Sequence, residues 1–178
     1  KSGPVLVTAV LFVVMFLAGG ARYRGFLSAT TILNLMVSYS YLIVLAVGMS
    51  FVIISGGIDL SVGSVLALST IIAARLLQFG WNPIVVILLI LVITSVLGLL
   101  VGLMVHVFEI QPFIATLAAM FLARGMCYII AKESISITDP FFSWMAKTRI
   151  VLGYRMSITP SVVIALVVLA IAVWVLQY

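Results

Sequence analysis

The sequence predicts an all-α protein, a polytopic bundle of about six transmembrane helices with a glycine-rich break after the second. Of the 178 residues, 66% are hydrophobic and 7% are charged, against roughly 25% charged residues in ordinary soluble domains. The apolar residues form continuous runs close to the about 20 residues that a membrane helix needs, not the alternating segments of a membrane β-barrel. Two of these runs flank a turn with three glycines and one carboxylate at residues 56–64. We therefore expect residues 1–178 to form a single transmembrane domain.

The first three expected spans are set by apolar runs and by polar residues at their ends. They run from Pro4 to about Gly20, from the segment at residues 28–31 to about Ser55, and from about Ser61 to Leu77. Serine and threonine hydroxyls accept the free amides of the first turn of a helix, so residues 28–31 predict the start of the second span. Because further spans follow the first one, an uncleaved anchor is favoured over a cleaved signal peptide.

The last three expected spans begin at or beside prolines. They cover Pro83 to about Val107, Pro112 to about Ala131, and Thr159 or Pro160 to the end of the chain. Proline is favoured at the first helical position because the amide that it lacks would have no partner there. Residues 80–83 (GWNP) are a turn signal with an interfacial tryptophan. Residues 132–158 form the only long polar connection.

Chemistry-bearing residues are few, which excludes several classes of protein. The net charge of +5 lies in loops and helix ends, where it bears on membrane orientation and lipid head groups and gives no reason to expect a nucleic-acid partner. The lone Cys127 and the lone His106 form no metal-binding cluster. There is no P-loop sequence, no carboxylate pair and no nucleophile with an adjacent base. We therefore expect no enzyme activity, no metal and no cofactor in this chain.

Asp59 is the most informative residue of the turn at residues 56–64. No charged residue occurs from Gly25 to Ile58 or from Leu60 to Ala74, so Asp59 lies at or near membrane depth. An ionised group there costs about 3 kcal/mol on insertion scales. Irregular backbone is tolerated at that depth only when it is buried in protein or lines a watery cavity. This pattern favours a pathway through a bundle over a simple membrane anchor.

Three segments give the chain a resemblance to a known family. They are VGMSFVIISGGIDLSVGS at residues 47–64, IQPFIATL at 110–117 followed by FLARG at 121–125, and KESISI at 132–137. With them the chain resembles the permease subunits of bacterial monosaccharide ABC importers of the ribose, xylose, galactose and galactofuranose type, most closely the galactofuranose type. Branched-chain amino-acid permeases share the general fold but lack the GGIDLS form, so the sugar branch is favoured.

The resemblance implies a role, partners and an orientation. Family members are nearly twice as long, so the chain corresponds to the N-terminal half of a permease that moves a monosaccharide across the bacterial inner membrane. The implied partners are a cytoplasmic ATP-binding cassette subunit that uses ATP, a periplasmic sugar-binding protein, a second permease (identical or related) and membrane lipid. The resemblance places the N-terminus in the cytoplasm and residues 132–158 in the periplasm, whereas the positive charges alone favour an external N-terminus.

Ten residues are candidates for a substrate pathway or gate. They are Gly56, Gly57, Asp59, Ser61, Ser64, Asn34, Ser38, Tyr41, Gln111 and Thr116. Asp59 is expected either to cap the following helix or to contact a sugar hydroxyl or gate the path. The glycines, Gly63 among them, permit the turn and close packing, or let substrate approach the backbone. Ser61 and Ser64 either cap the helix or face the path.

The polar stripe on the second span leaves two interpretations open. Asn34, Ser38 and Tyr41 recur at helical spacing, so they share one face. Polar groups inside a membrane helix normally face the bundle interior. They are expected either to bond neighbouring helices or to line a sugar pathway. Gln111, beside Pro112, is expected first of all to start the fifth span.

Small residues predict two helix-packing faces. Gly98 and Gly102 form a GxxxG pair on the fourth span, and Ala115, Ala119 and Ala123 recur every four residues on the fifth. Such spacing lets helix backbones approach closely. A compact bundle is expected, whatever its function.

Two expectations concern the end of the fifth span and the loop after it. Arg124 is expected to extend to the lipid head groups or to pair with Glu133 or Asp139. A short interfacial helix is expected around the aromatic residues of the loop, Phe141, Phe142 and Trp144.

Two other functions remain open on the sequence. Glycine-broken helices with an intramembrane carboxylate also suit an ion- or proton-coupled secondary transporter. The chain also fits a truncated membrane component that packs against other helices and transports nothing.

Overall fold

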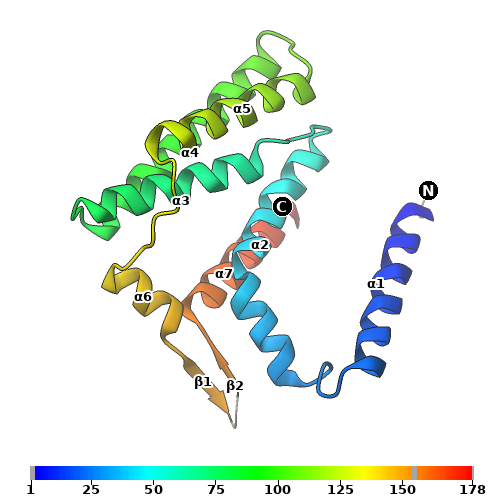
Figure 1. The fold of residues 1–178 in the computed structure, drawn as a ribbon. Coiled ribbons are helices and arrows are strands. Elements are labelled where there is room, and N and C mark those ends of the chain that lie inside the picture. Colours follow the sequence, from blue (N-terminus) through cyan, green and yellow to red (C-terminus); the bar gives the residue numbers. More distant parts are fainter. Residues whose placement is uncertain (1–2, 154–155, 178) are drawn as a thin grey trace.

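The computed structural model describes residues 3–153 and 156–177, and Figure 1 shows them as helices with one small hairpin. The elements are α1 (Gly3–Arg22), α2 (Ala29–Ile54), α3 (Val62–Gln78), α4 (Pro83–His106), α5 (Pro112–Ile130), α6 (Pro140–Lys147), β1 (Ile150–Gly153), β2 (Met156–Ile158) and α7 (Pro160–Gln177). In the described part of the chain, α1, α2, α4, α5 and α7 are long and apolar enough to cross a membrane. The prediction of a polytopic helical membrane protein is confirmed.

The third expected span is the short one. Helix α3 has 17 residues, and at 1.5 Å per residue it is about 26 Å long. A typical hydrocarbon core is about 30 Å thick. The expectation of about six spans therefore becomes five long helices with one shorter apolar helix among them.

Helix starts follow the polar residues that the sequence places there. The Ser28 hydroxyl accepts a hydrogen bond from the Thr31 amide at 3.2 Å and opens α2. The Asn82 side-chain oxygen accepts from the Ile84 amide at 2.9 Å, with Pro83 in the first position of α4. Both contacts satisfy amides that have no partner within the helix.

The helices pack in two groups. Helix α3 lies against α5 and α4, and α2 lies against α7, while α1 stands apart (Figure 1). The buried cluster between α3 and α5 consists of Leu68, Ala123 and Cys127. In α7, Val162 and Ala165 are fully buried. Small and mid-sized apolar residues thus fill the contacts, as close helix packing in membranes requires.

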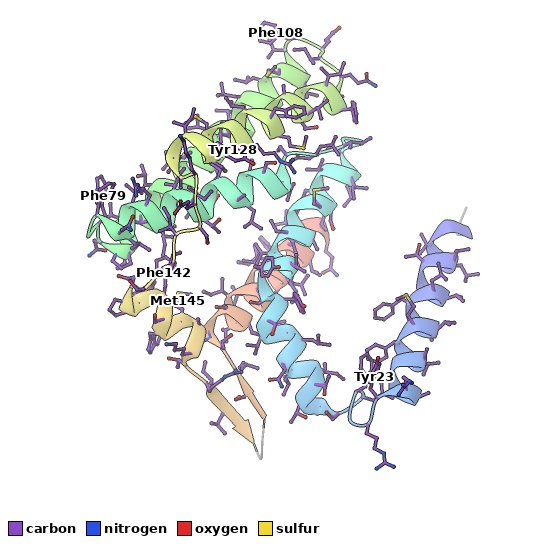
Figure 2. The ribbon with its side chains drawn as sticks, viewed as in Figure 1. Tyr23, Phe79, Phe108, Tyr128, Phe142 and Met145 are labelled. Carbon is purple, nitrogen blue, oxygen red and sulfur yellow. The ribbon has the colours of Figure 1, made fainter. Side chains whose placement is uncertain are left out.

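Most other apolar side chains point outward. Figure 2 shows Phe79, Phe108 and Tyr128 projecting from the helices, and between 67% and 73% of each is exposed. In water such a surface would be an aggregation hazard. Around a membrane protein it is the surface that contacts lipid or other membrane helices.

The polar connection contains more structure than the sequence predicts. The expected short helix is present as α6, whose start is capped by the Asp139 carboxylate at 2.9 Å from the Phe141 amide. It is followed by an antiparallel hairpin, β1–β2, which pairs Ile150 with Ile158. Strand β2 contacts α2. This hairpin is the exception to the all-α prediction.

Candidate functional site

The chain leaves α2 through a glycine-dependent cap. The amide of Gly56 donates to the Ile53 carbonyl at 3.0 Å, and the amide of Gly57 donates to the Val52 carbonyl at 2.9 Å. Gly56 has φ +79°. This pair of bonds with a left-handed residue between them is a Schellman motif, in which glycine is favoured because it has no Cβ to clash. The helix therefore ends here for a local reason, and the backbone turns toward α3.

Asp59 holds the turn that leads into α3 by bonding Ser61, the residue before the helix, and not by capping the amides of the first turn. Its Oδ1 accepts from the Ser61 amide at 2.7 Å and from the Ser61 hydroxyl at 2.6 Å. Asp59 is half-buried, and Ser61 is buried. Among the described residues, Asp59 Oδ2 has no hydrogen-bond partner. One carboxylate oxygen thus holds the turn, and the other is left for a further donor.

Thr116 joins the break to the start of α5. Its hydroxyl lies 3.1 Å from the Ile58 carbonyl oxygen and 2.9 Å from the Pro112 carbonyl oxygen, and only 4% of the residue is exposed. The structure therefore brings together the two segments, at residues 47–64 and 110–117, that the sequence analysis singled out. Gln111 lies at the N-terminal cap position of α5, exposed and without a side-chain cap bond.

Arg124 contacts a different partner from those expected. Its Nε donates to the Ser64 hydroxyl at 3.2 Å, and Ser64 is 4% exposed. This contact crosses the α3–α5 interface, and the Arg124 side chain remains exposed, so its expected extension to the lipid head groups stays a prediction.

A cavity of about 860 Å³ adjoins the break between α2, α3, α4 and α5. Its walls are mainly apolar, and its polar groups come from Ser55, Asp59, Ser61, Ser69, Thr94 and Thr116. Gly56 and Gly57 also line it. Largely apolar walls with a few convergent polar groups are typical of small-molecule sites, which measure roughly 300–1,000 Å³.

Several predicted residues lie elsewhere. Asn34, Ser38 and Tyr41 are exposed on α2 and do not line the cavity. Their neighbour Ser40 is buried instead, beside a kink at Tyr39 (φ −120°, ψ 19°). A periodic polar stripe therefore does not identify the face of α2 that is buried in the described chain.

The two predicted packing faces differ from each other. Ala115 and Ala123 are buried at 1% and 2% exposure, and Ala119 lines the cavity. A Cβ placed on Gly98 or Gly102 would meet no atom within 4 Å. These two glycines line the cavity. In the described chain they therefore face open space and do not pack against another helix.

The fold class is a polytopic helical membrane bundle with a helix break beside a cavity, an arrangement typical of membrane transport subunits. Comparison with known proteins gives the family: the chain belongs to the branched-chain amino acid transport system permease components, whose model matches residues 31–178.

The similar proteins are permease components of ABC transporters and sugar importers. The inner membrane ABC transporter permease protein YjfF of Escherichia coli (strain K12) is 37% identical over 94% of this chain and 52% of its own length. The fructose import permease protein FruG of Bifidobacterium longum is 40% identical over 75% of this chain and 39% of its own. The ribose import permease protein RbsC of Haemophilus influenzae is 37% identical over 85% of this chain and 47% of its own length.

The chain spans about half the length of these curated relatives. No solved structure matches it significantly. Members of this family are transporter subunits and not enzymes in themselves.

Proposed function

We propose that this chain is the N-terminal half of the permease of an ATP-binding-cassette importer that moves a monosaccharide across the bacterial inner membrane. One observation carries the proposal. The GGIDLS turn and the start of α5, joined by Thr116 at 3.1 Å from the Ile58 carbonyl, border a cavity in a chain related to fructose and ribose import permeases.

The polar groups at the cavity suit a neutral polyhydroxyl substrate. Asp59 Oδ2 is an acceptor without a partner among the described residues, and carboxylates accept strongly from hydroxyl groups. The hydroxyls of Ser61 and Thr116 lie at the same cavity. The apolar walls suit the carbon face of a sugar. In this proposal the irregular backbone between α2 and α3 lets the two helices change their relative angle during transport.

The partners follow from the class of transporter. ATP is bound and hydrolysed by a cytoplasmic ATP-binding cassette subunit, and sugar arrives on a periplasmic binding protein. A second permease, identical or related, completes the translocation path. Residues 132–158 face the periplasm in this arrangement. The hairpin and the α1–α2 connection lie at one end of the molecule in Figure 1, so both are on that side.

A secondary transporter is the competing function, and Asp59 is the observation that favours it. A half-buried carboxylate beside a broken helix is also a typical site for coupled ions or protons. The two functions differ in their energy source, since a secondary transporter needs no ATPase subunit.

Native mass spectrometry of the protein purified from its own membrane in mild detergent tests the proposal. We expect a complex that contains an ATPase subunit, with a mass well above the 19.2 kDa of this chain. A free chain of 19.2 kDa with no nucleotide-binding partner would contradict the proposal for this product and favour a component that does not transport.

A further inference from the structure

Two connections join the two packed groups of helices in the described chain. Helices α3, α4 and α5 form one group, and α2, α6, α7 and the β1–β2 hairpin form the other, with the main packing contacts inside each group. The first connection is the break between α2 and α3, and the second is the segment between α5 and α6. These two connections therefore decide how one group can turn relative to the other.

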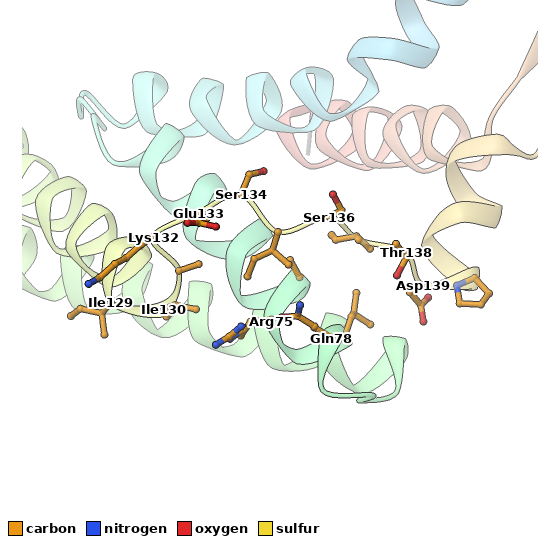
Figure 3. Close-up of a pocket in the computed structure, with 16 residues that line it drawn as sticks. Arg75, Gln78, Ile129, Ile130, Lys132, Glu133, Ser134, Ser136, Thr138 and Asp139 are labelled. Carbon is orange, nitrogen blue, oxygen red and sulfur yellow. Dashed lines mark hydrogen bonds between the residues drawn. The ribbon is translucent and has the colours of Figure 1, made fainter.

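The second connection does not oppose a change of angle between the groups. Residues 132–138 are neither helix nor strand, and Figure 3 shows them as an extended segment between α5 and α6. Among the described residues, their backbone groups form no hydrogen bond with other backbone groups. The backbone bonds that direct such a change therefore lie at the α2–α3 break.

The hydrogen bonds of the break assign its residues to one group or the other. The amides of Gly56 and Gly57 are bonded to carbonyls of α2. The Ile58 carbonyl oxygen accepts from the Thr116 hydroxyl of α5 at 3.1 Å. Among the described residues, the Gly57 carbonyl and the Ile58 amide have no hydrogen bond. The peptide that joins Gly57 to Ile58 therefore separates the residues held by α2 from those held by α5.

The bond from Thr116 to the break is one of three that its hydroxyl can make. The hydroxyl oxygen also lies 2.9 Å from the Pro112 carbonyl oxygen and 3.3 Å from the Phe113 carbonyl oxygen of its own helix. A hydroxyl has one hydrogen to donate. The two carbonyls in α5 also accept helix amides, whereas the Ile58 carbonyl has no second donor among the described residues. Loss of the hydroxyl would therefore leave only Ile58 without a partner.

We propose that the α2–α3 break is a hinge that bends at the peptide between Gly57 and Ile58, and that Thr116 fixes this pivot by holding Ile58 on α5. Hinges are a few residues at the ends of elements that absorb changes in φ and ψ. Asp59 follows the pivot, so it stays with α3 and α5 when α2 turns. The cavity has walls from α2 and from the other group, so the turn changes its width around a fixed carboxylate.

The inference rests on the proposed function, in which this cavity takes the sugar, and adds the residue that positions Asp59 while the cavity changes. Thr116 is 4% exposed, so water does not readily replace its hydroxyl at the Ile58 carbonyl. Its role is that of a positioning residue, because it acts on the carboxylate through the backbone of the break.

Residue-resolved hydrogen–deuterium exchange tests where the pivot lies. The full permease, with its ATPase subunits in lipid nanodiscs, is compared with Thr116→Val, which replaces the hydroxyl by a methyl group. We expect the Ser61 amide, which Asp59 holds beyond the pivot, to exchange about fivefold faster, the factor carried by one typical hydrogen bond. The Gly56 and Gly57 amides, held by α2, should be unchanged. Thr116→Ser keeps the hydroxyl and should restore the slower exchange.

Thr70→Val is the matched control. Among the described residues, the Thr70 hydroxyl donates only to the Ala67 carbonyl of its own helix, at 2.8 Å, and Thr70 does not line the cavity. This control should change no exchange rate at the break. Unchanged exchange at Ser61 in Thr116→Val would overturn the proposal. Equal acceleration of the amides on the α2 side would overturn it as well, since both sides of the break would then depend on Thr116.

A transport measurement separates this inference from the proposed function. The number of sugars imported per ATP hydrolysed is measured in liposomes with the binding protein. We expect this ratio to fall in Thr116→Val and recover in Thr116→Ser, because hinge motion then occurs without a fixed Asp59. Partial unfolding would lower uptake and hydrolysis together and leave the ratio unchanged.

Each outcome of the transport measurement has a distinct meaning. An unchanged ratio in Thr116→Val would overturn the role of Thr116 in transport. Absence of ATP-driven uptake by the unmodified protein would contradict the proposed function, while the exchange rates would still decide the pivot. If Thr116→Val does not assemble, Thr116→Ala takes its place, since it removes the hydroxyl and puts no carbon atom against the Ile58 carbonyl.

Discussion

At the scale of single residues, hydrogen bonds at the α2–α3 break decide which side chains are free to act. Asp59 uses one carboxylate oxygen for Ser61, at 2.7 and 2.6 Å. Thr116 and Arg124 reach across from α5 to Ile58 and Ser64. A side chain that holds the turn through one atom still has another atom to offer a substrate, so structural and functional roles coexist at Asp59.

The negative charge of Asp59 and its role as a hydrogen-bond acceptor can be tested by separate substitutions. Asp59→Asn keeps an Oδ1 acceptor for Ser61 and removes the charge. We expect the pH dependence of sugar uptake by the full transporter to be unchanged, because an ATP-driven cycle does not require Asp59 to bind a proton. Initial uptake rates over a series of pH values measure this, and loss of proton coupling in the variant would favour a secondary transporter.

Asp59→Ala, which lacks the acceptor, should lower the free energy of unfolding by about 1 kcal/mol.

The Arg124–Ser64 contact is tested by a double-mutant cycle. Arg124→Gln and Ser64→Ala each remove one partner of the 3.2 Å bond. Because hydrogen bonds between membrane helices couple by roughly 0.6–1.7 kcal/mol, the double variant should be less destabilised than the sum of the singles by about that amount. Thermal unfolding in detergent gives the four values. Strict additivity would mean that the two side chains do not interact.

Residue-level sequence reasoning works where the partner is close along the chain. Ser28 and Asn82 are capping residues that the local sequence indicates, and both make the expected bond. The contacts of Thr116 and Arg124 join residues 58 and 60 positions apart. Only the packing of α3 on α5 sets these distances, so the sequence alone could name both residues but not their partners.

At the scale of elements, the break between α2 and α3 is a backbone feature. Gly56 occupies a left-handed conformation with open space around it. A Cβ added to Gly57 would lie 3.2 Å from the Val52 side chain.

Membrane spans are easy to recognise because each is a long apolar run. The short β1–β2 hairpin was missed, since its few residues in a polar connection give no comparable signal.

Gly56 at the break and Gly63 in α3 give a matched test of this conformation. Gly56→Ala forces a residue with a Cβ into φ +79°, which costs about 1–2 kcal/mol. Gly63→Ala places the same methyl in helix α3, where an added Cβ meets nothing within 4 Å, and should stabilise by up to about 1 kcal/mol. Thermal unfolding of both variants measures the difference. An equal effect at the two positions would mean that the left-handed cap does not set the break.

At the scale of the whole molecule, this chain has helix faces that only lipid or other membrane helices can cover. None of α1 is buried within its membrane-spanning window, and Gly98 and Gly102 face open space. The relatives are about twice as long. Exposed small residues on a membrane helix are suited to close helix contact, so transport activity is expected of the assembled transporter and not of these residues alone.

The energy source of transport tests the central claim most directly. The full permease is reconstituted into liposomes with its ATPase subunit and binding protein, and uptake of a panel of radiolabelled monosaccharides is followed. We predict that one sugar accumulates only when ATP is hydrolysed, with no effect of a protonophore. Accumulation driven by a pH or sodium gradient in the absence of ATP would contradict the assignment to an ABC importer.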